Sequence, residues 1–174
     1  MYMVLLRKGV TIMEINDQAR KQLLAQVEHL SDEDINRKPA EDRWSVKQIL
    51  QHLCLMEGGV TKIIQTRLAS NEQNLATDKP IQLAVQRSTK VEAPDFVTPT
   101  GDFSALEELK AQLSATHSAL HVLAENTPAE HLEVKSHPHP VFGEMNLKQW
   151  IPFVGYHELR HIEQIKEVKE QLGI

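Results

Sequence analysis

The sequence has little cysteine, few aromatic residues and no large excess of one charge. Its 174 residues include a single cysteine, Cys54, which excludes an internal disulfide and fits a reducing cytoplasm. Nineteen basic and twenty-four acidic residues give a net charge of -5, so neither nucleic acid nor an anionic membrane is expected as a partner. We therefore expect an ordinary globular protein of the cytoplasm.

Long apolar runs are also missing. No segment approaches the roughly 20 apolar residues that a membrane span needs. The first ten residues, M-Y-M-V-L-L-R-K-G-V, lack a small-residue cleavage site, so no signal peptide is predicted. The length suits one domain over residues 1–174. The unusual feature is nine histidines, which matter only if several of them converge.

Apolar residues recur at steps of three and four in four segments, which predicts four helices. The first covers residues 12–30 and ends before Pro39. The second follows R-W-S-V-K-Q, where Ser45 and Gln48 predict a capping box, and it runs to about Leu68. Its inner face includes a histidine, His52.

The third and fourth helices are predicted in the second half of the chain. Ser104 and Glu107 predict another capping box at the start of the third helix. Residues 136–145 form a turn-rich connector, after which Asn146 can cap the last helix.

A long polar connector of residues 70–103 separates the second helix from the third. Its prolines and irregular pattern indicate little secondary structure, although strands are left open in residues 81–97. A connector of this length in a bundle is best explained as a crossover from one end to the other. The fold class expected is all-α, a four-helix bundle with parallel second and third helices, of the up-down-down-up type.

The last helix contains H-E-x-x-H, with His157 and His161 four residues apart. On a helix they lie one turn apart on one face, and two imidazoles so placed can reach one ion at about 2.0–2.1 Å. Apolar neighbours turn this face inward, where a neutral, metal-bound imidazole avoids the cost of burying a charge. The alternative is a chance pair in a histidine-rich chain.

His52 occupies the inner face of the second helix, between Ile49 and Met56. A single histidine on an apolar face is more often a hydrogen-bonded core residue than a ligand. Together with His157 and His161 it would supply three protein ligands, the number that a catalytic zinc site uses while leaving a position open.

Gly58 and Gly59 follow in the same helix, where each costs up to about 1 kcal/mol relative to alanine. They indicate either a kink near the metal or close packing against a neighbouring helix.

H-E-x-x-H is also the pattern of zinc peptidases, in which Glu158 would be the catalytic base. The extended motif with a third histidine after a glycine is absent beyond His161, and no clear edge strand precedes the helix to hold a peptide. A metallopeptidase is therefore not favoured. Glu158 could still serve as a base for water or a thiol, or be a carboxylate on the helix surface.

Two segments together resemble the DinB-like (YfiT-like) family of metalloenzymes. They are R-W-S-V-K-Q-I-L-Q-H-L at residues 43–53 and F-V-G-Y-H-E-L-R-H-I-E-Q-I at residues 153–165. The family pattern is a W-S capped helix with one histidine and a final helix with H-x-x-x-H-x-x-Q-I. The resemblance implies a four-helix bundle with a crossover, and His52, His157 and His161 as ligands of a divalent transition metal, commonly nickel or zinc. It also implies a homodimer.

The resemblance leaves the reaction open. Characterised relatives include thiol S-transferases and isomerases that use low-molecular-weight thiols, and many others have no assigned activity. A metal lowers the pKa of a bound thiol, and borderline-soft zinc or nickel accepts sulfur. We therefore expect a metal-dependent transferase or hydrolase acting on a small molecule. The alternative is a non-catalytic, metal-stabilised dimeric bundle with a stress-related role.

Several residues are predicted to support the site. The amide of Gln164 could orient a histidine or a ligand, and Trp150 lies on the metal face as core or pocket wall. His117 is the candidate if a fourth protein ligand exists, although a residue so placed is more often a histidine at the boundary of the core. His137 and His139 belong to a loop that could flank the site. Cys54 lies roughly 200° round the helix from His52, and we expect it to pack as an apolar residue rather than act as a nucleophile.

Overall fold

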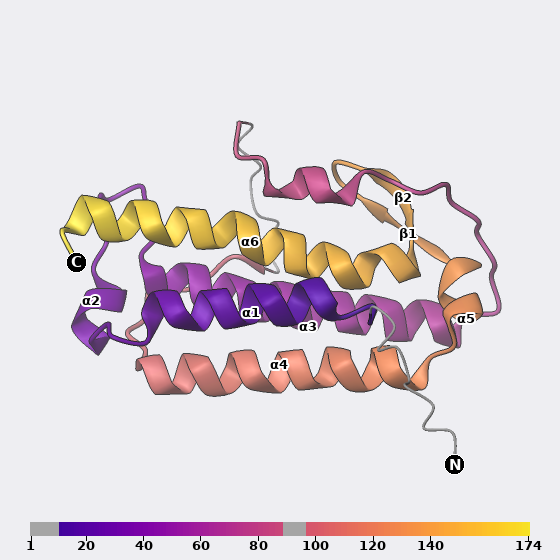
Figure 1. The fold of residues 1–174 in the computed structure, drawn as a ribbon, viewed down its shortest axis with the longest axis horizontal. Coiled ribbons are helices and arrows are strands. Elements are labelled where there is room, and N and C mark those ends of the chain that lie inside the picture. The colour runs from indigo at the N-terminus through magenta and orange to yellow at the C-terminus, as the bar shows by residue number, and fades with distance from the viewer. Residues whose placement is uncertain (1–10, 89–96) are drawn as a thin grey trace, which may run out of the picture.

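The computed structural model describes residues 11–88 and 97–174. The signal-peptide prediction falls outside these ranges, and so do residues 89–96 of the segment 81–97 in which strands were left open. The described residues 81–85 of that segment form a 3₁₀ helix and no strand. The described part contains six α-helices, a 3₁₀ helix and one pair of strands (Figure 1). In chain order these are α1 (Glu14–Val27), α2 (Asp32–Asn36), α3 (Val46–Ala69), the 3₁₀ helix η1 (Ile81–Val85), α4 (Leu106–Asn126), α5 (Ala129–Glu133), β1 (Ser136–His139), β2 (Gly143–Asn146) and α6 (Leu147–Leu172).

The four long helices form a bundle in which α1 packs on α6, α6 on α3 and α3 on α4. In Figure 1, α3 and α4 run in one direction while α1 and α6 run in the other. The connection between α3 and α4 therefore travels from one end of the bundle to the other. The predicted up-down-down-up arrangement is confirmed. No helix in the described residues is long and apolar enough to cross a membrane.

Helix starts were predicted correctly at two of three positions. The Ser45 side chain accepts a hydrogen bond from the backbone N–H of Gln48, whose side chain accepts from the backbone N–H of Ser45. Asn146 caps α6 in a similar way. The capping box predicted at Ser104 is wrong, because α4 begins at Leu106 with no side-chain cap from its own N-terminus.

The backbone N–H of Leu106 donates instead to Asp32 of α2, at 2.7 Å. This carboxylate comes from a short helix that the sequence pattern did not predict, and Ser31 caps it through a capping box with Asp34. A distant side chain therefore replaces the local cap of α4.

The connector at residues 136–145 is more ordered than predicted. β1 and β2 pair antiparallel, with Ser136 opposite Asn146 and His139 opposite Gly143. Gly143 has φ +69°, a left-handed conformation that glycine adopts without steric cost. The hairpin leads directly into α6 and packs its aromatic residues near the N-terminal half of that helix.

The core consists of two apolar clusters with a polar layer between them. One cluster includes Leu23, Leu53 and Ile162, and the other includes Val60 and Val154. The polar layer takes one side chain from each long helix: Arg20, Glu57, His117 and Glu158. Arg20, Glu57 and Glu158 are each at most 6% exposed. The layer lies beside the predicted metal ligands, because Glu158 directly follows His157 in α6.

Candidate metal centre

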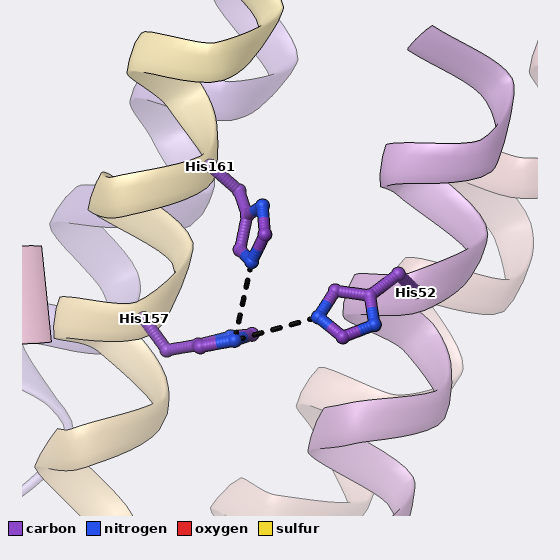
Figure 2. A group of neighbouring side chains, drawn as sticks. All are labelled: His52, His157 and His161. Carbon is purple, nitrogen blue, oxygen red and sulfur yellow. Dashed lines mark hydrogen bonds between the residues drawn. The ribbon is translucent and has the colours of Figure 1, made fainter. Parts of the chain in front are cut away.

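The three predicted histidines converge between α3 and α6. His157 and His161 are one turn apart on α6, and His52 faces them from α3 (Figure 2). The Nε2 atom of His157 lies 3.4 Å from Nε2 of His52 and 3.2 Å from Nε2 of His161. All three ligand atoms lie within 4.8 Å of one another.

These separations suit a metal ion. Bonds of about 2.0–2.1 Å to imidazole nitrogens place neighbouring nitrogens about 3 to 3.5 Å apart in tetrahedral or octahedral geometry. The two nitrogen pairs at 3.2 and 3.4 Å already fall in that range. An ion would therefore fit with little movement of the rings.

Hydrogen bonds at the outer nitrogens determine what faces inward. Nδ1 of His52 donates to the backbone carbonyl of Val97 at 2.8 Å, and a carbonyl can only accept. Nδ1 of His161 donates to the side-chain oxygen of Gln164, also at 2.8 Å. Both histidines consequently carry their hydrogen on the outside and turn an Nε2 lone pair toward His157. His157 has at most one Nε2 hydrogen for two lone pairs, whereas a cation satisfies all three nitrogens.

His157 differs from its two partners in its surroundings. Its Nδ1 is buried and has no hydrogen-bond partner within the described residues. The residue as a whole remains partly exposed, whereas His52 and His161 are only 4% and 9% exposed. Of the three histidines, His157 is therefore the one with appreciable solvent-exposed surface, and the Phe153 ring lies 5.8 Å from its imidazole.

Burial also keeps the three imidazoles uncharged at neutral pH. Loss of solvent lowers the pKa of His52, although the bond to Val97 opposes this shift. The pKa of His161 falls to about 3, through burial and then the nearby His52. Burial and the other two histidines hold the pKa of His157 well below its usual range. A neutral imidazole is the form that binds a metal.

Glu158 does not share the histidines' surroundings. It is 3% exposed, so the interpretation as a surface carboxylate is wrong. Arg20 of α1 donates from Nε to one carboxylate oxygen at 2.9 Å and from Nη2 to the other at 3.0 Å. Burial raises the pKa of Glu158, opposed by these bonds from Arg20. Both oxygens are thus occupied by an ion pair.

The buried ion cluster around Arg20 was not predicted from the sequence. Its guanidinium also donates to Glu57 of α3 at 2.9 Å and to the backbone carbonyl of Leu113 on α4. The signal was weak: Arg20 and Glu57 each directly follow a residue of the apolar stripe, Ala19 and Met56, and charged residues at such positions usually reach solvent.

His117 bonds Glu57 and Asp17 and lies in a different group from the three histidines. His117, the candidate for a fourth ligand should one exist, therefore lies outside the three-histidine group. Cys54 is buried, and burial raises the pKa of its thiol to about 12, as expected for a packed side chain and not for a nucleophile.

The aromatic neighbours divide into two groups. Trp150 is 3% exposed and belongs to the apolar cluster beside the hairpin, with its ring 5.5 Å from Phe153 and 5.3 Å from His139. Phe153 stands between Trp150 and His157. Trp44, which the site prediction omitted, places its ring 5.1 Å from His52. Its position in the R-W-S motif was the available signal.

The chain is similar in sequence to known proteins along most of its length. The family model of the DinB superfamily matches residues 15–165. "Uncharacterized protein YuaE" of Bacillus subtilis (strain 168) is 33% identical over 160 residues, which cover 92% of this chain and 98% of that protein.

Two solved structures share the fold. YfiT from Bacillus subtilis, described as "a probable metal-dependent hydrolase with an unusual four-helix bundle topology", matches with a TM-score of 0.63 at 16% identity, covering 96% of this chain and 92% of YfiT. The four-helix bundle protein TT2238 matches with a TM-score of 0.61 at 20% identity, covering 90% of this chain and 96% of TT2238. At these identities the two structures support the bundle topology alone.

Proposed function

This chain belongs to the DinB superfamily, and from that premise we propose that it is a metal-dependent enzyme with an open three-histidine site. His52, His157 and His161 would hold one divalent transition ion, nickel or zinc. The substrate would be a small molecule, and the incoming nucleophile would be a low-molecular-weight thiol or water.

One observation carries the proposal: two buried imidazoles are held with their lone pairs pointing at a third. Without a cation this arrangement lacks the hydrogens to satisfy its inward nitrogens. Imidazole nitrogens suit zinc, nickel, copper and iron, whereas calcium and magnesium prefer oxygen ligands. The donor set therefore favours a borderline ion over a hard one.

The residues around the site suggest how a substrate is received. When bound, such an ion acts as a Lewis acid and lowers the pKa of a coordinating thiol or water. Val97 and Gln164 hold the outer nitrogens of two histidines and thereby fix the ring orientations. Trp44 and Phe153 add apolar surface beside His52 and His157, which limits the access of bulk water. Cys54 is too deeply buried to compete as a nucleophile.

Two alternatives receive less support. A peptidase would need Glu158 as its base, and Arg20 occupies both oxygens of that carboxylate. A closed, purely structural site would need a fourth protein ligand. Within residues 11–88 and 97–174, the histidine group contains three members and His117 is not among them. Three ligands leave a coordination position free for a thiol or for water.

The test is the metal content of untagged protein, measured by plasma mass spectrometry after loading with nickel or zinc and removal of weakly bound metal. We expect the parent to retain one tightly bound ion and the variants His52→Ala and His157→Ala to lose it. His131→Ala, an exposed histidine of α5, is the matched control and should retain the ion.

The nickel-loaded parent is then titrated with a small thiol such as cysteine. A sulfur-to-nickel charge-transfer band in the near ultraviolet would support thiol activation. Retention of tight metal by His52→Ala would contradict the cross-helix site. A bound ion whose spectrum changes with neither thiols nor small anions would contradict an open position and favour a structural role.

A further inference from the structure

A second group of potential ligands lies between α1 and α4. Asp17 of α1 approaches His117 and His121, which are four residues apart on α4, and the three ligand atoms lie within 4.8 Å of one another. Oδ1 of Asp17 is 2.9 Å from Nε2 of His117 and 2.7 Å from Nε2 of His121. The two imidazole rings meet edge to face, with centroids 5.2 Å apart. Both histidines thus direct Nε2 at one carboxylate oxygen.

The outer nitrogen of His117 is held by a buried carboxylate. Its Nδ1 lies 3.0 Å from Oε1 of Glu57, a residue only 1% exposed. Thr116 donates to the other oxygen of Glu57 at 2.6 Å, and Arg20 donates to it at 2.9 Å. Burial tends to raise the pKa of Glu57, but the bonds from His117 and Arg20 together lower it. The carboxylate is therefore ionised, and His117 must donate from Nδ1.

This arrangement repeats a known feature of metal sites. Histidine ligands commonly donate their second ring nitrogen to a carboxylate, which fixes the tautomer and increases the basicity of the other nitrogen. Glu57 orients His117 in this way from inside the protein. Glu57 belongs to a third helix, α3, and its hydrogen bond to the cluster goes to His117 and not to Asp17 or His121. The orientation of His117 by Glu57 is therefore evidence separate from the proximity of the three ligand atoms.

The charges also favour a cation. With Nδ1 of His117 committed to Glu57, its Nε2 can approach the Asp17 carboxylate only through a proton or a metal ion. Both ring nitrogens of His117 lie at hydrogen-bonding distance from a carboxylate oxygen, so in the metal-free protein a proton fills that position. A divalent ion can replace it and add the bond to His121.

The ligand atoms require only a small adjustment. An ion with bonds of about 2.0–2.2 Å separates its ligand atoms by about 3 to 3.5 Å, slightly more than the present 2.7 and 2.9 Å. The side chain of Asp17 is 47% exposed and can withdraw, while His117 stays anchored by Glu57. Two imidazoles and one carboxylate favour zinc, copper(II) or nickel.

We propose that Asp17, His117 and His121 form a second divalent-cation site, separate from the three-histidine centre. This second site binds zinc, copper(II) or nickel and joins α1 to α4. The ion has three protein ligands, and water completes its coordination because the cluster is partly open to solvent. The side chains of His117 and His121 are 17% and 31% exposed. Binding is weaker than at the buried centre and releases the proton of His117.

Zinc titration of metal-free protein tests the proposal by calorimetry in two buffers of different ionisation enthalpy. The parent should bind two equivalents, the weaker one with proton release. His121→Ala should weaken that equivalent at least about tenfold and leave the tighter one unchanged. His121 is suitable because its bonds go to Asp17 and Glu125 and not to the buried ions. His131→Ala is the matched control.

The variant His157→Ala separates this site from the three-histidine centre. It should lose the tighter equivalent and keep the weaker one, and the double variant with His121→Ala should bind neither. A parent that binds one equivalent, unaffected by His121→Ala, would overturn the second site while leaving the proposed enzyme centre standing. Two equivalents that both persist in His121→Ala would overturn it as well. Circular dichroism confirms that each variant keeps its helices.

Discussion

Hydrogen bonds to the outer ring nitrogens decide which histidine nitrogen can face a metal. At the three-histidine centre these partners are a carbonyl, Val97, and an amide, Gln164. Helical spacing was sufficient to predict that His52, His157 and His161 share the inner faces. The tautomers could not be predicted, because Val97 is 45 residues from His52 and meets it only in the folded bundle. Gln164 could be predicted, since it lies one turn from His161 on the same helix.

Acidification should destabilise the metal-free protein through the buried histidines. Unfolded histidines bind protons near pH 6.5, whereas burial lowers the pKa of His161 to about 3. Between these values unfolding takes up a proton, so stability is present above pH 6.5 and is lost as the pH falls. We expect His161 to contribute about 1.4 kcal/mol per pH unit in this window.

Urea unfolding at pH 7 and pH 5 measures this effect. His161→Gln should reduce the loss of stability on acidification relative to the parent, because one buried site that resists protonation is removed. His29→Gln, at an exposed position, should leave the loss unchanged. Equal losses in the parent and in His161→Gln would show that His161 is not held neutral by burial.

At the scale of elements, helix caps formed by residues close in sequence were predicted, whereas contacts between residues distant in sequence were not. Ser45 and Asn146 cap their own helices, and both were predictable from residues three positions apart. The start of α4 was mispredicted because its capping carboxylate, Asp32, is 74 residues away. The hairpin was missed because its strands have four residues each and no alternating apolar pattern. Short elements depend on neighbours that a single-sequence pattern does not contain.

Two glycines show how packing decides the effect of the same substitution. A Cβ on Gly58 would lie 3.7 Å from Thr116 of α4, an ordinary contact, and α3 continues unbroken through this position. The presence of glycine at position 58 therefore does not have to be explained by a kink in α3. Gly58→Ala should stabilise the protein by up to about 1 kcal/mol, since alanine restricts the unfolded chain and favours helix.

Gly155→Ala is the matched comparison in α6. Its Cβ would lie 2.8 Å from the backbone nitrogen of Asn16, so α1 would have to move. We expect it to lower the free energy of unfolding by about 1–3 kcal/mol through overpacking. Thermal unfolding of both variants should show that Gly58→Ala raises the stability and Gly155→Ala lowers it. A destabilised Gly58→Ala would indicate that α3 and α4 are packed more closely than the contact with Thr116 implies.

At the scale of the whole molecule, Arg20 connects all four long helices. It lies on α1, pairs with Glu57 of α3 and Glu158 of α6, and donates to the carbonyl of Leu113 on α4. The apolar stripes predicted that four helices would associate in a bundle. They did not predict this contact, because each charged residue lies at the edge of its stripe and pairing appears only once the helices are arranged. The homodimer implied by the family resemblance stays a prediction.

Replacing Arg20 should therefore lower the free energy of unfolding by more than the loss of its apolar contacts alone would. Arg20→Met keeps much of the side-chain volume but removes both hydrogen bonds to the buried Glu158 and leaves the buried Glu57 with His117 and Thr116 alone. We expect a loss of about 3–5 kcal/mol in the free energy of unfolding, measured with urea at neutral pH. Arg37→Met, which removes an exposed ion pair with Asp34, should change it by less than about 1 kcal/mol.

The triple variant Arg20→Met, Glu57→Leu, Glu158→Leu separates charge from packing. Because it removes both buried carboxylates together with the guanidinium, it should recover most of the stability that Arg20→Met loses, as replacement of buried ion pairs by apolar residues can. It should also leave His117 without its anchor and weaken the second cation site, while the three-histidine centre still binds its ion. A loss below about 1 kcal/mol for Arg20→Met would mean that the carboxylates are hydrated or protonated, and that the ion cluster does not hold the four helices in register.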